Sequence, residues 1–277
     1  MDTTQRTIER GEASRLLAPI ADLVSDAGAR IVELVAAGLS HRAKADRSPV
    51  TVADEAAEEI LCEGLARLLP GVPVIAEEAA SRCMPALPQG AYLVVDPVDG
   101  TRELVAGRDE YTVNVGLVEG GTPVLGVLFA PGRKALYAGA GGEALRIALV
   151  PGARFDREAA EPIRARPRPA RFVALTSRSH PDERSERFLA ELPIEKRLPV
   201  GSSLKFAHLA EGAADVYARL FSVSEWDIAA GHALLVAAGG SVNAPDGKAI
   251  AYGAKRADFI VDGFVAWGAP GRADKPD

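Results

Sequence analysis

The chain has 277 residues, of which 32 are basic and 38 are acidic, so its formal net charge at neutral pH is −6. Hydrophobic residues make up 48% and charged residues 25%, which are values typical of a folded globular protein and not of a disordered one. The acidic balance disfavours binding to nucleic acid through a broad basic surface. The length is sufficient for one or two domains.

The N-terminal residues lack the apolar core of a signal peptide, and no apolar run approaches the ~18 residues needed to cross a bilayer. The two cysteines, Cys62 and Cys83, form neither a disulfide framework nor a zinc motif. We therefore expect a cytoplasmic protein that does not associate with membranes.

The first half of the sequence predicts two helices followed by a run of strands. Apolar residues recur at helical spacing over residues 7–38 and 52–69. Pro19 is expected to kink or divide the first helix. Apolar or alternating runs predict strands at Val72–Ala76, Ala91–Val95, Thr112–Val118, Pro123–Phe129 and Leu136–Ala138. The Glu-Gly-Gly sequence at residues 119–121 predicts a hairpin turn.

The second half mixes strands and helices more evenly. It begins after a segment rich in Arg and Pro, residues 151–171, which we interpret as a solvated surface stretch, with anion binding as the alternative. Strands are expected at Phe172–Leu175, Val216–Leu220 and, last in the chain, Phe259–Val261. Helices are expected over residues 181–191, 202–211 and 227–238. The mixture predicts a mixed α/β (α+β) fold with an N-terminal half, residues 1–145, and a C-terminal half, residues 146–277.

Acidic side chains follow two of the predicted strands in the first half. Glu77-Glu78 comes after one strand and leads into a loop over residues 79–90, and Asp96 and Asp99 come after the next strand. Such carboxylates converge in one crevice, where a cation is needed to offset their repulsion. Oxygen donors without His or Cys indicate Mg²⁺. Taken singly, each carboxylate also has a structural explanation. Asp99, for example, fits a β-turn or a helix N-cap.

The next residues predict an anion site beside these carboxylates. Gly100-Thr101 opens a short predicted helix over residues 102–106, where unpaired N–H groups favour phosphate. A cation beside such amides is typical of phosphoryl transfer to water. The sequence contains no Cys-x₅-Arg, Asp-x-Asp, Walker or Gly-x-Ser-x-Gly motif, which excludes several other phosphatase and hydrolase chemistries.

Three motifs together resemble the inositol monophosphatase superfamily, over most of the chain. They are Glu77-Glu78, the run Asp96-Pro97-Val98-Asp99-Gly100-Thr101, and Trp226-Asp227 at the head of an apolar helix that ends in Gly-Gly. Other segments resemble one bacterial branch, the CysQ type of 3′(2′),5′-bisphosphate nucleotidase. These segments are Thr176–His180, Gly201–Phe206 and Ala210–Gly212.

The resemblance implies a fold and an activity. The fold is a layered αβαβα sandwich of the inositol monophosphatase and fructose-1,6-bisphosphatase type. The branch hydrolyses the 3′-phosphate of adenosine 3′,5′-bisphosphate, giving AMP, and serves sulfate assimilation. The resemblance further implies two or three Mg²⁺ ions, and with the carboxylate site it predicts inhibition by Li⁺ and by Ca²⁺. The expected partner is this small nucleotide, and the protein is expected to be a monomer or a homodimer.

Carried over residue by residue, the resemblance also implies a set of metal ligands. Glu77, Asp96 and the Val98 carbonyl oxygen would hold one Mg²⁺ ion. Asp96, Asp99 and Asp227 would hold a second, and Glu77 would reach a third through water molecules.

The same resemblance implies three catalytic residues: Asp54 and Thr101, which would orient and deprotonate the attacking water, and Glu77, which would also hold metal ions. Asp54 has a structural alternative, because Thr51-x-x-Asp54 before an apolar run also fits a helix capping box. Both roles are compatible at this position.

The remaining expected site residues contact the substrate. The Gly100 and Thr101 amides would bind the phosphate, while the nucleotide would contact His180, Ser203, Lys205 and Arg219. Lys205 has the alternative of a solvated lysine, and Arg219 that of a structural ion pair. His232, on an apolar helix, is expected to be a core histidine with a hydrogen-bond partner.

Other functions stay open at this point. Within the superfamily, the alternative is an inositol monophosphatase or a sugar phosphatase similar to fructose-1,6-bisphosphatase. A dinucleotide-binding redox protein would rest on Gly139-x-Gly141-x-x-Ala144, but two adjacent turns explain these glycines better. A binding protein without catalytic activity is disfavoured by the complete set of carboxylates.

Overall fold

The computed structural model describes residues 10–38, 41–43, 49–180, 182–253 and 258–269. Its helices are α1 (Arg10–Ala36), α2 (Val52–Leu68), α3 (Glu77–Arg82), α4 (Thr101–Val105), the 3₁₀ turn η1 (Pro131–Arg133), α5 (Glu183–Ala190), α6 (Leu204–Ala210) and α7 (Glu225–Ala237). None of the helices in these ranges combines the length and the apolar character that a membrane crossing requires.

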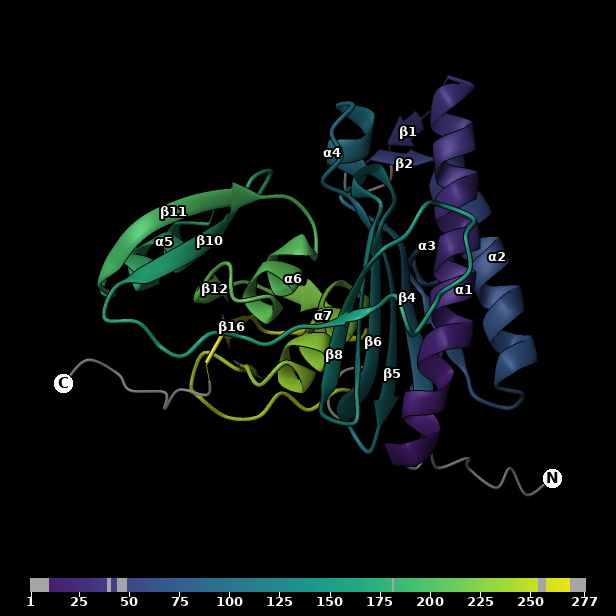
Figure 1. Cartoon of the computed structure of the whole chain (residues 1–277). Coiled ribbons are helices and arrows are strands. Elements are labelled where there is room, and N and C mark those ends of the chain that lie inside the picture. The colour runs from purple at the N-terminus through teal and green to yellow at the C-terminus, as the bar shows by residue number, and fades with distance from the viewer. Residues whose placement is uncertain (1–9, 39–40, 44–48, 181, 254–257, 270–277) are drawn as a thin grey trace.

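Two sheets form the centre of the molecule (Figure 1). The seven-stranded sheet contains, in order, β3 (Val74–Ala76), β4 (Tyr92–Asp99), β5 (Thr112–Glu119), β6 (Thr122–Ala130), β7 (Ala135–Ala140), β8 (Glu143–Ala148) and β9 (Glu161–Pro162). The five-stranded sheet contains β11 (Ile194–Val200), β10 (Phe172–Ser177), β12 (Val216–Arg219), β16 (Phe264–Trp267) and β14 (Ser241–Asn243). Two short pairs are β1 (His41–Ala43) with β2 (Pro49–Thr51), and β13 (Val223–Ser224) with β15 (Ile260–Val261).

The helices alternate with these sheets in five layers. Helices α1 and α2 cover one face of the seven-stranded sheet, and α6 and α7 lie between its other face and the five-stranded sheet, beyond which lies α5 (Figure 1). One apolar cluster lies under α1 and α2, and a second joins the two sheets through α6 and α7. The αβαβα sandwich that the resemblance implies is thus confirmed.

Helix α7 approaches the seven-stranded sheet closely because glycines on the sheet face it. A Cβ atom at Gly126 would lie 2.0 Å from the carbonyl oxygen of Ala230, and one at Gly139 would lie 2.6 Å from the Cα atom of Leu234. Only glycine permits such contact between a strand and a helix backbone. This packing fixes the height of α7, and of Asp227 in its first turn, above the sheet.

Most predicted elements are confirmed with shifted ends, but several expectations were wrong. Pro19 does not divide α1, because Leu16, Leu17 and Ile20 around it are buried against the sheet. The loop expected over residues 79–90 begins as helix α3. The last strand is β16 and not residues 259–261.

Other differences concern the middle of the chain. Strand β11 was not predicted, since its exposed sequence has no apolar alternation. Gly139 and Ala144 lie in paired strands β7 and β8, joined by one turn, and not in two adjacent turns. The start of the helix expected from residue 7, and residue 181, lie outside the described residues.

The Arg- and Pro-rich segment, residues 151–171, is largely exposed, as expected, but several contacts anchor it to the rest of the molecule. It contributes β9 to the seven-stranded sheet, and Arg166 forms a two-pronged ion pair with the buried carboxylate of Asp215. The division expected between residues 145 and 146 stays a prediction. It falls within β8, while the chain leaves the seven-stranded sheet only after β9.

Candidate active site

A cleft of about 620 Å³ opens between the edge of the seven-stranded sheet and the second half of the chain. Every residue expected in the site lines it except Asp54, which is buried beside it. These lining residues are Glu77, Asp96, Val98, Asp99, Gly100, Thr101, His180, Ser203, Lys205, Arg219 and Asp227. The structure therefore brings together lining residues that are up to 150 positions apart in the sequence, from Glu77 to Asp227.

Strand register places the first carboxylates side by side. Strands β3 and β4 are parallel, and Ala76 pairs with Val95, so the next residues, Glu77 and Asp96, reach the same edge of the sheet. The pairing of β4 with β5 is irregular between Asp96 and Asp99, which turns the strand end into the cleft.

The turn after β4 requires a glycine. Gly100 has φ +96°, and a Cβ atom there would lie 3.0 Å from the carbonyl oxygen of Glu110. The chain then enters α4 at Thr101. The left-handed turn thus lets α4 begin directly beside the carboxylates.

Asp227 enters the cleft from α7, which begins two residues earlier than expected. The helix starts with a capping box, in which the Asp227 Oδ2 atom accepts a hydrogen bond of 3.1 Å from the Ser224 amide. Asp227 therefore combines a structural role with its place in the cleft.

The carboxylates act on one another most strongly at Asp96. Burial and the charges of Glu77, Asp99, Asp227 and Asp54 raise the pKa of Asp96 well above its usual range. Like charges this close are unfavourable unless a cation offsets them. Within the described part of the chain, no three Asp, Glu, His or Cys side chains are grouped closely enough to coordinate one ion without moving. The all-oxygen donor set and its charge nonetheless fit the chemistry of a hard divalent cation.

Asp54 joins two hydrogen-bond systems. Its Oδ2 atom accepts hydrogen bonds from the Thr51 amide at 2.8 Å and the Thr51 hydroxyl at 2.5 Å, which completes the capping box of α2. Its Oδ1 atom lies 3.0 Å from the Thr101 hydroxyl, which also lies 3.0 Å from the Val98 carbonyl oxygen. The structural role of Asp54 in the capping box is therefore confirmed, and the same geometry is compatible with the catalytic role, which stays a prediction.

Ser203 and Lys205 line the cleft, and their contact with the nucleotide stays a prediction. The Ser203 hydroxyl lies 2.6 Å from Asp99 Oδ2 and 3.0 Å from the Asp227 carbonyl oxygen. Lys205 is buried and not a solvated lysine, and its ammonium donates to the carbonyl oxygens of Val200 and Ser202. Both side chains are occupied by the protein itself.

His180 and Arg219 lie in the same cleft. Partial burial, Arg219 and Arg102 lower the pKa of His180, so the neutral imidazole is favoured at neutral pH. Arg219 stacks on Phe221, with its guanidinium carbon 4.3 Å from the ring centroid, and among the described residues its buried Nε atom has no hydrogen-bond partner. An inward guanidinium with a spare donor is suited to an anion.

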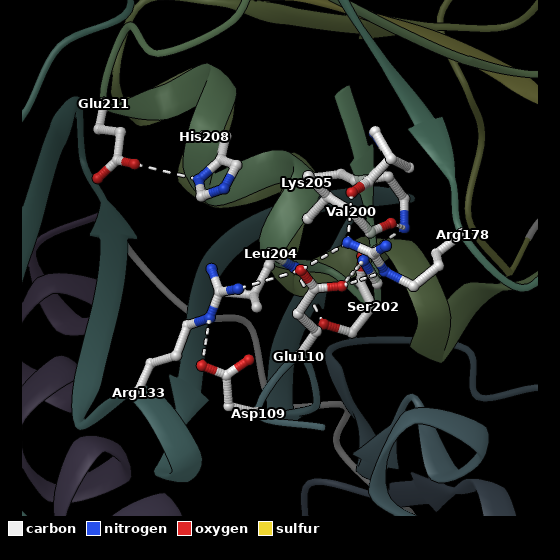
Figure 2. A network of polar contacts seen from close by, with 12 residues as sticks. Asp109, Glu110, Arg133, Arg178, Val200, Ser202, Leu204, Lys205, His208 and Glu211 are labelled. Atoms are coloured by element: carbon white, nitrogen blue, oxygen red, sulfur yellow. Dashed lines mark hydrogen bonds and ion pairs between the residues drawn. The ribbon is translucent and has the colours of Figure 1, made fainter. Parts of the chain in front are cut away.

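Sequence reasoning missed the residues that support the site. Asn114 pairs with Asp96 across the strands and donates to Ser203, and its place opposite Asp96 follows only from the register of β5. Glu110, which is buried, forms an ion pair with the exposed Arg178 next to the turn that carries Ser202 (Figure 2). No sequence signal links Glu110, Arg178 and Ser202, because they come from three separate segments of the chain.

Comparison with known proteins agrees with this fold. A model of the inositol monophosphatase family matches residues 12–266. The 3′(2′),5′-bisphosphate nucleotidase CysQ of Salmonella typhimurium is 38% identical over 251 residues, which are 90% of this chain and 98% of that protein. The CysQ of Escherichia coli strain K12 is 39% identical over 221 residues, 80% of this chain and 86% of that one.

Solved structures give the same result. The crystal structure of CysQ from Bacteroides thetaiotaomicron has a TM-score of 0.75 at 32% identity, covering 92% of this chain and 97% of that one. The inositol monophosphatase from Anabaena has a TM-score of 0.69 at 25% identity, covering 94% and 92%. Sequence motifs, layers and comparisons therefore agree that the chain belongs to the inositol monophosphatase family.

Proposed function

We propose that the chain is a Mg²⁺-dependent phosphatase that hydrolyses the 3′-phosphate of adenosine 3′,5′-bisphosphate to AMP and phosphate, and that it serves sulfate assimilation in the cytoplasm. The observation that carries the proposal is the carboxylate cluster around Asp96, which shares one cleft with the Thr101–Asp54 pair and with Arg219. The names of the CysQ relatives support the choice of substrate.

The metal ligands of the proposal are oxygen atoms at this cluster. Glu77, Asp96 and the Val98 carbonyl would hold one Mg²⁺, and Asp96, Asp99 and Asp227 a second, with Glu77 near a third. When bound, the ions would activate the attacking water and stabilise the leaving oxygen. The proximity of these groups in the cleft supports the assignment.

Thr101 and Asp54 form a short path for the proton of the attacking water. The Thr101 hydroxyl donates to Asp54 Oδ1, which leaves a lone pair on Thr101 Oγ1 to accept a proton from water. Asp54 then receives the proton of the hydroxyl, while Thr51 holds its other oxygen. The pair thus acts as a general base.

The substrate would span the cleft. The amides of Gly100 and Thr101 would bind the 3′-phosphate, and His180 and Arg219 would contact the nucleotide. Ser203 and Lys205 would also contact the nucleotide, while their polar atoms bind protein groups as well.

A substrate panel tests the proposal. Phosphate release is measured with adenosine 3′,5′-bisphosphate, inositol 1-phosphate and fructose 1,6-bisphosphate, in Mg²⁺ and in EDTA. We expect the nucleotide to have the highest kcat/KM, activity to require Mg²⁺, and millimolar Li⁺ or Ca²⁺ to inhibit. A ten-fold or greater preference for inositol phosphate, which corresponds to about 1.4 kcal/mol, would favour the inositol monophosphatase alternative.

A further inference from the structure

Glu110 is a buried carboxylate outside the proposed metal site. Its two oxygen atoms receive a two-pronged hydrogen bond from Arg178, at 2.7 and 2.9 Å, and a third hydrogen bond from Arg133 at 3.1 Å (Figure 2). Burial opposes its ionisation, but the hydrogen bonds from Arg178 and the Gly201 amide hold the pKa of Glu110 below its usual range. Glu110 is therefore a fixed negative charge at neutral pH.

This charge holds one specific turn. The Gly201 amide donates to Glu110 Oε2 at 2.9 Å, and Arg178 also donates to the Pro199 carbonyl oxygen at 2.7 Å. A Cβ atom at Gly201 would lie 2.8 Å from the Glu110 carbonyl oxygen, so the two segments touch through their backbones. Glu110 and Arg178 thus bind the backbone on both sides of Val200, at the Gly201 amide and at the Pro199 carbonyl.

The turn itself is strained and needs such support. Ser202 has φ +51°, in the left-handed region that residues with a side chain rarely adopt. The Lys205 ammonium binds the carbonyl oxygens of Val200 and Ser202, at 3.2 and 2.6 Å, and closes the turn from the other side (Figure 2). The strained backbone of this turn is therefore bound by the Glu110 carboxylate on one side and by the Lys205 ammonium on the other.

The turn places the Ser203 hydroxyl in the cleft, next to Asp99. This hydroxyl lies 2.6 Å from Asp99 Oδ2, and it accepts a hydrogen bond of 3.1 Å from Asn114. The partners of a ligating carboxylate set its orientation and so tune the bound metal.

We propose that Glu110 is a positioning residue, which through the Gly201–Ser203 turn holds the Ser203 hydroxyl on Asp99 and so orients this carboxylate for the cation. The inference rests on the proposed metal role of Asp99. The chain also offers a matched control, because Asp215 receives a similar pattern without a second arginine: two hydrogen bonds from Arg166 and one from a backbone amide, that of Val173, away from the cleft.

The experiment compares Glu110→Gln with Asp215→Asn. Mg²⁺ binding to the substrate-free protein is measured by titration calorimetry, and thermal unfolding checks that both variants fold. Both variants should lose stability, but only Glu110→Gln should weaken Mg²⁺ binding, by at least about three-fold, with kcat falling at saturating substrate. If Glu110→Gln does not fold, Arg178→Lys, which keeps the charge but loses the two-pronged geometry, replaces it.

A double variant tests whether Glu110 acts through Ser203. Ser203→Ala should weaken Mg²⁺ binding by about ten-fold, and Glu110→Gln/Ser203→Ala should bind Mg²⁺ no more weakly than Ser203→Ala alone. Additive losses, or a Glu110→Gln variant that binds Mg²⁺ like the wild type, would overturn the positioning role. A wild-type protein that binds no Mg²⁺ would instead overturn the proposed function itself.

Discussion

Asp54 shows how one side chain serves both the fold and the proposed chemistry. One oxygen completes the capping box of α2 with Thr51, and the other accepts from Thr101. A substitution at Asp54 therefore affects stability and activity together, whereas one at Thr51 affects mainly the cap.

Asp54→Asn is expected to lower kcat by about 100-fold or more, because a general base is lost. Its free energy of unfolding should fall by about 1 kcal/mol, the usual contribution of an N-terminal cap. Thr51→Ala should lose similar stability and far less activity. Equal losses of kcat in the two variants, measured by phosphate release, would show that Asp54 acts only through the helix cap.

His232 predicts a pH dependence of stability. It is buried, it lies 3.0 Å from the Tyr252 hydroxyl, and burial lowers its pKa from 6.5 to about 4, which confirms the expected core histidine. Below pH 6.5 the unfolded chain binds a proton that the folded chain does not, so folding is disfavoured as the pH falls towards 4.

The wild type should therefore lose about 3 kcal/mol from this residue between pH 7 and pH 4, at about 1.4 kcal/mol per pKa unit. His232→Gln removes the titrating group and should flatten this part of the curve, measured by urea unfolding at several pH values. Parallel curves for the two proteins would mean that His232 is protonated as easily in the folded state as in the unfolded state.

The sequence could predict the acidic residues of the site but not their supports. Glu77, Asp96 and Asp99 are visible because each follows an apolar strand. The burial of Lys205 and the bond of Ser203 to Asp99 depend on a left-handed turn at Ser202, which no local pattern indicates.

Among the elements, the contact of β6 with α7 is the most sensitive to a single methyl group. Gly126→Ala would place a Cβ atom 2.0 Å from the Ala230 carbonyl oxygen, so α7 must shift. We expect a loss of about 1–3 kcal/mol in the free energy of unfolding, as for other overpacked cores. Because Asp227 lies one turn before Ala230 in α7, kcat should fall as well.

Gly11→Ala is the control for this variant, because a Cβ atom there meets no heavy atom within 4 Å. It should leave activity unchanged and not lower stability. If the Gly126→Ala protein had the free energy of unfolding and the kcat of the wild type, the contact between Gly126 and Ala230 would not fix the position of α7 above the sheet.

The elements that the apolar pattern predicted are those with at least one buried face. Helices α1 and α2 bury an apolar stripe under the sheet, and β4 and β5 are buried on both faces. Strand β11 lies at the edge of its sheet with an exposed, charged sequence, and its existence follows from pairing with β10 alone.

At the scale of the molecule, the carboxylate cluster opposes folding until a cation binds. Asp96→Asn should raise the free energy of unfolding in EDTA, because it removes a buried charge among like charges. It should also abolish stabilisation by Mg²⁺, which for the wild type is about 2.7 kcal/mol at 100 times Kd.

Urea unfolding in EDTA and in Mg²⁺ measures both effects, with the exposed Asp246→Asn as control, which should behave like the wild type in both conditions. An Asp96→Asn protein that is less stable than the wild type in EDTA would contradict the electrostatic interpretation of the cluster.

The layered fold could be predicted through the motifs and not through periodicity. Patterns of apolar residues indicate helices and strands, but the order of strands, such as β16 between β12 and β14, depends on pairing between distant segments. The motifs supply this order because they identify a family whose fold is shared.

The position of α7 between the two sheets has a consequence for local motion. Nearly all of its residues are buried, so its amide protons should exchange with solvent only when the whole molecule unfolds, while those of the largely exposed α5 exchange through local opening. Hydrogen exchange measured by mass spectrometry would show this difference. Because Asp227 lies in this buried helix, its place in the cleft should be lost no more often than the fold itself.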